Sequence, residues 1–340
     1  MKGRVIALGE PSDRSGRAAL IVDGILQDLL IDPDAGSIPY PGQIYAAVVD
    51  RPVPNLGATF ARLPGDLMTY VRDAGQVSAG ARIIVQITGF PEPDKAFPAT
   101  TEYLLKSRTV ILTPGRPGVN VSRAIKDTDL KERLAVLGQQ CLATFEHDGG
   151  LILRTEAATA DIGEIEEAIR LLVEDDGAVL DNLANEDGPA LLLNDPAGQR
   201  ARREWMTSGT EIATLETLGT DPFEHFGVWD EVERLTSPRV DLPSGGWMAV
   251  EATRAMVTVD VNTGDQFGGG AAMTANIEAA RELPRQLRLR GLGGQVVIDC
   301  APIKKMHRKK IEETLKSAFR RDPIATTLAG WTPLGNFELQ

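Results

Sequence analysis

The chain has 340 residues and a formal net charge of −12, so it is long enough for several small domains and is not uniformly basic. Its two cysteines, Cys141 and Cys300, lie far apart and its three histidines do not cluster, which excludes a disulfide framework and a histidine-rich metal site. No signal peptide or membrane-spanning apolar run is visible, and we expect a soluble, cytoplasmic protein with no membrane partner.

The charge is unevenly distributed along the chain. Residues 281–321 contain 12 Lys or Arg and 4 Asp or Glu, a local net charge of +8, so the remaining residues sum to −20. A strongly basic segment in an acidic protein predicts a local site for a polyanion.

The first hundred residues have the pattern of short strands. Three alternating segments separated by turn residues predict a small antiparallel meander: 5–8, 17–22 and 26–31. Closely spaced strands with Pro and Gly between them are typical of a five-stranded barrel and are expected at 43–49, 58–62, 67–71 and 82–90.

The middle of the chain changes character. Strands are expected at 109–112 and 151–155, followed by an amphipathic helix that begins near Ile162. Its apolar face is expected to contain Ile162, Ile165, Ile169, Leu172 and Val173. Residues 196–236 have the pattern of mostly polar helix and linker.

Residues 237–340 have the clearest pattern. A turn at 242–246 leads into a strand, and then into the strand that carries Asp260. A helix at about 276–290 separates it from the strand that ends at Asp299, and a last helix covers about 307–321. Strand–helix–strand is a βαβ unit, so the two aspartate strands should be parallel neighbours. Pro284 should kink the first helix or break it in two.

Asp260 and Asp299 each follow a short apolar run that is typical of a buried strand. Asp260 and Asn262 share one strand face, so Asn262 could orient Asp260 or position a water. Two carboxylates at strand ends, facing a basic helix, suit metal-assisted phosphate chemistry, and the oxygen ligands favour magnesium or manganese. The plainer alternative is that Asp260 only caps a turn and that Asp299 is a helix N-cap or a loop residue.

Arg281, Arg285 and Arg288 form one stripe of the intervening helix. Arginine binds phosphate through two donors at once, so this stripe is a candidate phosphate contact, and a solvated helix face is the alternative.

Several long segments of the last hundred residues resemble the ribonuclease E/G family, and their sequences are closer to its ribonuclease G branch. They are Leu242-Pro243-Ser244-Gly245-Gly246, Val259-Asp260-Val261-Asn262-Thr263-Gly264, Asn276-Ile277-Glu278-Ala279-Ala280, and Arg285-Gln286-Leu287-Arg288-Leu289-Arg290. The resemblance covers nearly the whole chain and is weaker in the middle.

The resemblance implies an α+β protein of several subdomains: an RNase H-like subdomain split in sequence, an inserted OB-fold barrel and 5′-sensor, and a DNase I-like catalytic α/β subdomain. The expected boundaries are 1–37 and 196–236 for the two RNase H-like parts, 38–105 for the OB-fold, 106–195 for the 5′-sensor and 237–340 for the catalytic subdomain.

The resemblance also implies an activity, namely Mg²⁺-dependent, single-strand-specific endoribonucleolytic hydrolysis that leaves 5′-phosphate products, in RNA processing or decay. Asp260 and Asp299 would hold the metal and Asn262 would support Asp260, while Arg285, Arg288 and Arg290 are candidate contacts to the RNA phosphates.

Two further RNA contacts follow from the resemblance. Phe60, Tyr70 and Lys95 fall where the family places two aromatics and a lysine against RNA, although a core role for Phe60 is the alternative. Arg154 and Thr155 resemble the pair that binds the RNA 5′-monophosphate, with Ile111 lining the pocket and Arg123 in the basic turn that follows.

The chain departs from the family pattern in two places. After Asp299 the family continues with Phe-Ile-Asp-Met, whereas this chain has Cys300-Ala301-Pro302-Ile303 and lacks that carboxylate. The family's CxxC zinc link is also missing, so neither a structural zinc nor a zinc-linked dimer is expected. These departures leave a non-catalytic RNA-binding or regulatory member of the family as the alternative, and a metal nuclease acting on DNA as a third.

Overall fold

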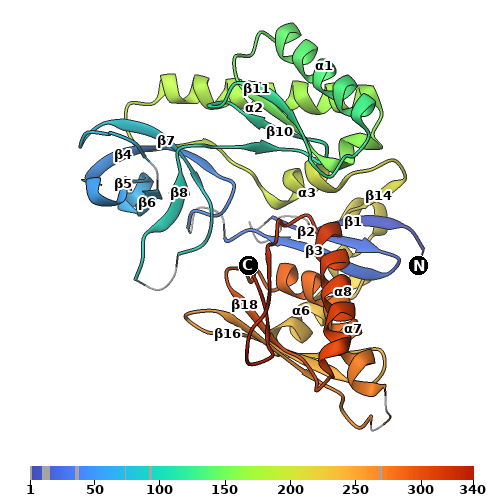
Figure 1. Cartoon of the computed structure of the whole chain (residues 1–340). Helices are drawn as coiled ribbons and strands as arrows, with labels where there is room; N and C mark the ends of the chain where they lie inside the picture. The colour runs from blue at the N-terminus through green and yellow to red at the C-terminus, as the bar shows by residue number, and fades with distance from the viewer. Residues whose placement is uncertain are drawn as a thin grey trace. The chain divides into compact units, whose positions relative to one another are not determined.

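The computed structural model describes residues 2–9, 16–34, 38–72, 74–91, 94–266, 268 and 270–340, which form a mixture of helices and mainly antiparallel sheets (Figure 1). The expected α+β class is confirmed. The chain divides into two compact units, Met1–Gly3 with Ala19–Leu29 and Thr220–Gln340, and Arg4–Ala18 with Leu30–Gly219. Within the described ranges, no helix is both long and apolar enough to cross a membrane.

A closed barrel lies in the unit that contains residues 30–219. Its five strands are β4 (Ile44–Val53), β5 (Ala58–Arg62), β6 (Met68–Arg72), β7 (Arg82–Ile87) and β8 (Phe97–Thr100), with the single 3-10 turns η1 (Pro54–Leu56) and η2 (Pro64–Asp66) between them. The strand order is β4-β5-β6-β8-β7, β4 also pairs with β7, and β6 is parallel to β8. This is an OB-like barrel. The expected barrel is confirmed, although its short fifth strand, β8, was not predicted.

A second sheet in the same unit has the strand order β11-β12-β10-β9. Its strands are β9 (Leu105–Lys106), β10 (Val110–Thr113), β11 (Gly118–Val121) and β12 (Gly150–Leu153). Helices α1 (Thr128–Thr144) and α2 (Ile162–Asn185) pack their buried residues against one face of it. Ile165, Ile169 and Leu172 of α2 are buried and Val173 is half-buried as expected, because they recur at helical spacing on one side. The expectation for Ile162 is wrong, since it is the first residue of α2 and is 64% exposed. A turn of 3-10 helix, η3 (Thr155–Ala158), follows β12, and β13 (Ala190–Leu193) pairs with β4.

The expected N-terminal strands are present as β1 (Arg4–Gly9), β2 (Arg17–Val22) and β3 (Ile25–Ile31). Residues 196–236, expected to be helix and linker, also contribute a strand, β14 (Thr210–Ala213), which pairs in parallel with β1. The remaining elements of this stretch are helices α3 (Ala197–Trp205), α4 (Leu215–Leu218), α5 (Pro222–His225) and α6 (Val228–Thr236).

The C-terminal part of the other unit is a sheet of order β15-β16-β17-β18-β20-β19. Its strands are β15 (Arg239–Asp241), β16 (Trp247–Ala252), β17 (Val257–Asn262), β18 (Val296–Asp299), β19 (Leu328–Trp331) and β20 (Phe337–Leu339). Helix α7 (Ala271–Leu289) connects the parallel strands β17 and β18, and α8 (Arg308–Arg321), preceded by η4 (Lys305–His307), packs beside α7. The predicted βαβ unit is therefore confirmed.

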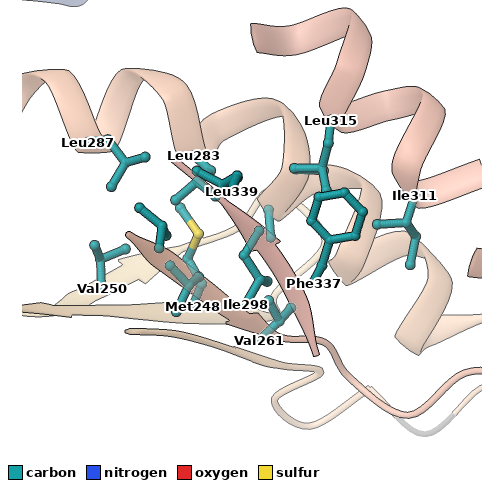
Figure 2. Packing of buried hydrophobic residues seen from close by; sticks show 14 of the residues in the cluster. Met248, Val250, Val261, Leu283, Leu287, Ile298, Ile311, Leu315, Phe337 and Leu339 are labelled. Atoms are coloured by element: carbon teal, nitrogen blue, oxygen red, sulfur yellow. The ribbon is translucent and has the colours of Figure 1, made fainter. Parts of the chain in front are cut away.

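Both helices lie on one face of this sheet. Figure 2 shows Leu283 and Leu287 of α7 and Leu315 of α8 above strand residues such as Val261 and Ile298. Helix α7 is continuous through Pro284, so it is not broken in two, and the other expected outcome, a kink, stays a prediction. The proline ring removes one helical hydrogen bond, but Pro284 is itself buried, and the packing of the surrounding apolar residues outweighs that loss.

Candidate active site

Asp260 and Asp299 lie side by side on two parallel strands. Asp260 belongs to β17, Asp299 ends β18, and the two are direct register partners. Neighbouring strands are about 4.8 Å apart, so two carboxylates on the same face at this register can reach one cation. Both residues are exposed. The close approach inferred from the βαβ pattern is confirmed.

Asn262 lies two residues beyond Asp260 on the same face of β17. Its Nδ2 donates a hydrogen bond of 2.8 Å to Asp260 Oδ2. Because this bond uses the amide nitrogen, Asn262 Oδ1 is left to accept from a water or to bind a cation. The contact supports the expected role of Asn262 in orienting Asp260, which stays a prediction.

The two aspartates project from the sheet face that α7 does not cover. Val259, Val261 and Ile298 are buried in the core on the α7 side. Side chains alternate along a strand, so Asp260 and Asp299 point to the opposite face. The expectation that the carboxylates face the basic helix is therefore wrong. The burial of the valines decides which face of the sheet the helix covers, and the aspartates take the other.

Arg285, Arg288 and Arg290, which the sequence offered as RNA contacts, are hydrogen bonded within the protein. Their carbonyl acceptors are Leu26 at 2.6 Å for Arg285, Gln27 at 2.8 Å for Arg288, and Leu235 at 2.8 Å and Ser237 at 2.7 Å for Arg290. Arg285 also pairs with Glu282, and Arg288 with Asp322. Burial lowers the pKa of both Arg288 and Arg290. These arginines are structural in this geometry, and their contact with RNA stays a prediction.

A buried asparagine on α7 secures the chain just after Asp299. Asn276 Nδ2 donates to the Ala301 carbonyl at 2.9 Å, and the Ala301 N–H donates to Asn276 Oδ1 at 2.9 Å. Both residues are about 2% exposed. Sequence reasoning did not assign Asn276 a role, although a polar residue at an apolar position of an amphipathic helix is the available signal.

The turn at 242–246 is hydrogen bonded to α7 and lies against the end of β17. Ser244 donates to Glu278 Oε2 of α7 through its backbone N–H at 3.0 Å and its Oγ at 2.8 Å. A Cβ on Gly264, which has φ +58°, would lie 2.5 Å from the Gly245 carbonyl oxygen. The turn at 242–246 thus approaches the residues after Asn262 so closely that only glycine fits there.

Cys300, next to Asp299, carries a thiol that resists ionisation. Burial, and secondarily the charge of Asp299, raise the pKa of its thiol to about 12. A thiol with that pKa stays protonated at neutral pH, and it is the thiolate that binds metals and acts as a nucleophile.

The donor set at the aspartates suits a hard divalent cation. No group of three or more His, Cys, Asp or Glu residues with metal-binding geometry occurs among the residues that the structure describes. Two adjacent carboxylates and an amide oxygen remain, and Mg²⁺ is commonly held by one or two carboxylates while it keeps several waters. The residues present therefore fit magnesium and do not form a dedicated zinc site.

The barrel brings its two candidate aromatics together. Phe60 of β5 and Tyr70 of β6 are cross-strand partners with ring centroids 5.2 Å apart. Both are half-buried, while Ala61 and Val71 on the alternate positions are in the barrel core. The Arg51 guanidinium lies 4.9 Å from the Phe60 centroid. The structure thus places Phe60 on the outside of the barrel, not in its core. Lys95 is exposed.

The 5′-sensor candidates gather at the end of β12. Arg154 Nη1 donates to the Ser107 carbonyl at 2.7 Å, and the Thr155 and Ser122 hydroxyls are 3.0 Å apart. Ile111 on β10 is half-buried on the face away from α1 and α2.

Arg123 directly follows Ser122 and is exposed. Strand pairing therefore gathers Arg154, Thr155 and Ile111 at one end of the sheet, and the contact between Ser122 and Thr155 brings the Arg123 turn to it.

Known proteins are similar to this chain over most of its length. A sequence model described as the Ribonuclease E/G family matches residues 104–217 and 205–340. Ribonuclease G of Escherichia coli strain K12 is 29% identical over 95% of this chain and 76% of its own length. Ribonuclease E of Nostoc sp. strain PCC 7120 is 28% identical over 95% of this chain and 53% of its own length.

A solved multidomain protein with nucleic acid binding domains from Streptococcus pneumoniae covers 52% of this chain and 71% of its own, at a TM-score of 0.16 and 15% identity, which is too low to support any argument. The family match, in contrast, includes both aspartates, Asn262 and the Arg154–Thr155 pair. The chain belongs to the ribonuclease E/G family.

Proposed function

We propose that this protein is a Mg²⁺-dependent endoribonuclease that hydrolyses single-stranded RNA and leaves 5′-phosphate products, in RNA processing or decay. The observation that carries the proposal is a pair of exposed carboxylates, Asp260 and Asp299, which lie opposite each other on neighbouring parallel strands in a chain of the ribonuclease E/G family. The coarser part of the proposal, a ribonuclease, rests on the names of the relatives, Ribonuclease G and Ribonuclease E.

In this proposal Asp260 and Asp299 hold the cation, and Asn262 fixes one oxygen of Asp260 so that the other is directed at the ligand. When bound, a magnesium ion acts as a Lewis acid on a phosphoryl oxygen and lowers the pKa of water. In this proposal Asn262 Oδ1 accepts a hydrogen bond from the attacking water. The exposed sheet face leaves room for an RNA strand to lie across both aspartates.

Recognition of single strands would fall to the barrel. Phe60 and Tyr70 offer aromatic faces on which unpaired bases can stack, and the cations Arg51 and Lys95 suit the phosphates. Bases within a duplex are already stacked and cannot occupy such faces, so this surface favours single-stranded RNA.

Recognition of the 5′ end would fall to Arg154 and Thr155. An arginine donor and a hydroxyl together suit a terminal monophosphate, which has more charge and more acceptors than a 5′-hydroxyl. We assign residues 106–195 to this sensor, 38–105 to the OB-fold, 1–37 and 196–236 to an RNase H-like subdomain, and 237–340 to a DNase I-like subdomain.

The central test is cleavage of a short, A/U-rich, 5′-monophosphorylated RNA by the wild type and by Asp299→Asn, with and without Mg²⁺. We expect metal-dependent cutting that disappears in the variant. Glu251→Gln is the matched control, because it removes a carboxylate from the same sheet at an exposed position of β16. An uncut RNA with wild-type protein and Mg²⁺ would reject the enzyme assignment.

End sensing has a separate test, namely the ratio of cleavage rates for RNAs that differ only in a 5′-monophosphate or a 5′-hydroxyl. Thr155→Val preserves the shape of the side chain and removes its hydroxyl, and Thr159→Val, at the end of the same turn, is the control. We expect the preference for the monophosphate to fall in Thr155→Val alone. An unchanged ratio would remove Thr155 from the sensor.

The second candidate function is RNA binding without catalysis. It is favoured by the sequence after Asp299, where Cys300 and Ala301 stand and the family's further carboxylate is missing. A binding protein would hold RNA equally well after Asp260→Asn and in the absence of Mg²⁺, and it would leave the RNA intact.

A further inference from the structure

A solvent-open groove of about 600 Å³ runs between α7 and α8. Its α7 wall contains Arg281, Pro284, Arg285 and Arg288, and its α8 wall contains Lys310, Glu313, Thr314, Ser317 and Arg321, with Gln27, Asp322 and Pro323 at one end. Five cationic and two anionic side chains therefore line it. Most of these cations belong to the segment 281–321, which has a net charge of +8.

The cations of this groove fall into two classes. Arg285 and Arg288 are neutralised by ion pairs, with Glu282 and Asp322 respectively. Arg281, Lys310 and Arg321 are exposed and have no ion-pair partner among the residues that the structure describes. The paired arginines fix the wall in place, and the unpaired cations supply charge for a ligand from solution.

The spacing of the polar groups along α8 suits an extended anion. Lys310, Thr314, Ser317 and Arg321 recur at three- and four-residue intervals and so form one stripe along α8. From Lys310 to Arg321 this stripe spans about 16 Å, at a rise of about 1.5 Å per residue. A single small anion would meet only one end of it, whereas a chain of phosphates can follow its whole length.

A membrane surface suits this groove less well. The apolar residues of α8 are Ile311, Leu315 and Phe319, and all three are buried in the core. A helix that binds a bilayer presents apolar side chains to the lipid. The groove presents charge and hydroxyl groups, which suit a phosphate backbone.

We propose that the groove between α7 and α8 is a second binding site for the RNA backbone, separate from the aspartates. The proposal rests on the proposed function, because it takes RNA as the substrate. The groove lies on the helix side of the sheet, whereas Asp260 and Asp299 project from the other face. RNA bound in the groove therefore gains affinity without touching the reacting phosphate, and only an RNA long enough to pass the sheet edge can use both sites.

The first experiment measures binding of a long and a short single-stranded RNA in EDTA, over a range of salt concentrations. The test variant is Lys310→Glu with Arg321→Glu. The matched control is Lys316→Glu with Arg320→Glu, which makes the same charge change at exposed positions of the same helix outside the groove. We expect the test variant to bind long RNA about tenfold more weakly. The slope of the logarithm of the binding constant against the logarithm of the salt concentration should be shallower by about 0.7 for each lost phosphate contact.

The acidic residue in the groove offers a test in the opposite direction. Glu313 lines the groove and Glu312, its neighbour in the chain, does not. Glu313→Gln should strengthen the binding of long RNA several-fold, whereas Glu312→Gln should change it little. A gain of function of this kind cannot come from misfolding.

The outcomes separate this proposal from the proposed function. If the wild type binds no RNA, the proposed function fails. If the wild type binds RNA and the two double variants lose affinity equally, the groove proposal is overturned and only net charge matters. If the test variant loses binding to anionic lipid vesicles but still binds RNA as well as the wild type, the groove proposal is also overturned. In cleavage assays with Mg²⁺ we expect the test variant to have a higher KM for long RNA and the kcat of the wild type. Its cleavage of a short RNA should equal that of the wild type.

Discussion

Asn276 holds the backbone of Ala301 through two hydrogen bonds of 2.9 Å, one to the carbonyl and one from the N–H. This contact fixes the chain two residues after Asp299, while Asp260 is fixed by the pairing of β17 with its neighbours. Helix α7 therefore controls the position of Asp299 from the face of the sheet opposite to the carboxylates.

Replacing Asn276 should affect both stability and the metal site. Asn276→Ala leaves two buried backbone groups of Ala301 without partners, so we expect a loss of about 2–4 kcal/mol in the free energy of unfolding. We also expect weaker Mn²⁺ binding in isothermal titration calorimetry. Gln286→Ala is the control, since Gln286 is a buried polar residue of the same helix that bonds to Glu282. Unchanged Mn²⁺ affinity in Asn276→Ala would deny it a positioning role.

Removing the partner of Asp260 should affect activity much more than stability. Asn262→Ala loses the 2.8 Å bond to Asp260 Oδ2, and groups that orient a metal ligand are typically worth about 10–100-fold in metal affinity or activity. The free energy of unfolding should change by no more than about 0.5 kcal/mol, because the bond is exposed. Thr258→Ala, two residues before Asp260 on the same face, should retain activity. Equal losses in both variants would mean that β17 as a whole was disturbed.

Gly264 should be far less replaceable than another glycine of the same conformation. Gly264→Ala adds a Cβ 2.5 Å from the Gly245 carbonyl, whereas Gly291, with φ +62°, has open space around its added Cβ. Both variants carry the cost of a positive φ, so the difference between them reports the collision alone. We expect Gly264→Ala to lose about 1–3 kcal/mol more in urea denaturation. Equal losses would show that the turn at 242–246 can move aside.

The reactivity of Cys300 should depend on pH in an unusual way. In a Cys141→Ala background it is the single thiol, and its pKa of about 12 means that little thiolate exists at pH 8. Alkylation by iodoacetamide should be slow there and should rise about tenfold per pH unit up to pH 11, whereas an ordinary thiol levels off above about pH 8.5. A plateau near pH 9 would contradict the raised pKa.

The βαβ unit and the aspartate pair could be predicted because the information is local. Each aspartate ends an apolar run of strand length, and the intervening helix has a clear 3.6-residue pattern. The orientation of the site does not follow from the arginine stripe of α7, because that stripe does not indicate which face of the sheet the helix covers. Val257, Val259 and Val261 already indicated which strand face the helix must cover.

Other features depend on contacts that no local pattern contains. Arg285 and Arg288 bond to carbonyls of Leu26 and Gln27, more than 250 residues away in sequence. Strand β14 has four residues and exists because it pairs with β1, about 200 residues earlier. Pairing with a distant strand can therefore make a segment extended even where its own residues have only a weak preference for β-structure.

The alternation along β17 divides its residues between two tasks, since one set packs the core and the other presents the carboxylate and its amide partner. The two sets can change independently through substitution, because a new core side chain leaves the exposed face untouched. Insertion of a single residue in this strand is different. It would turn Asp260 toward the apolar core and a valine toward solvent. The length and register of this strand are therefore more tightly constrained than the identity of any single core side chain in it.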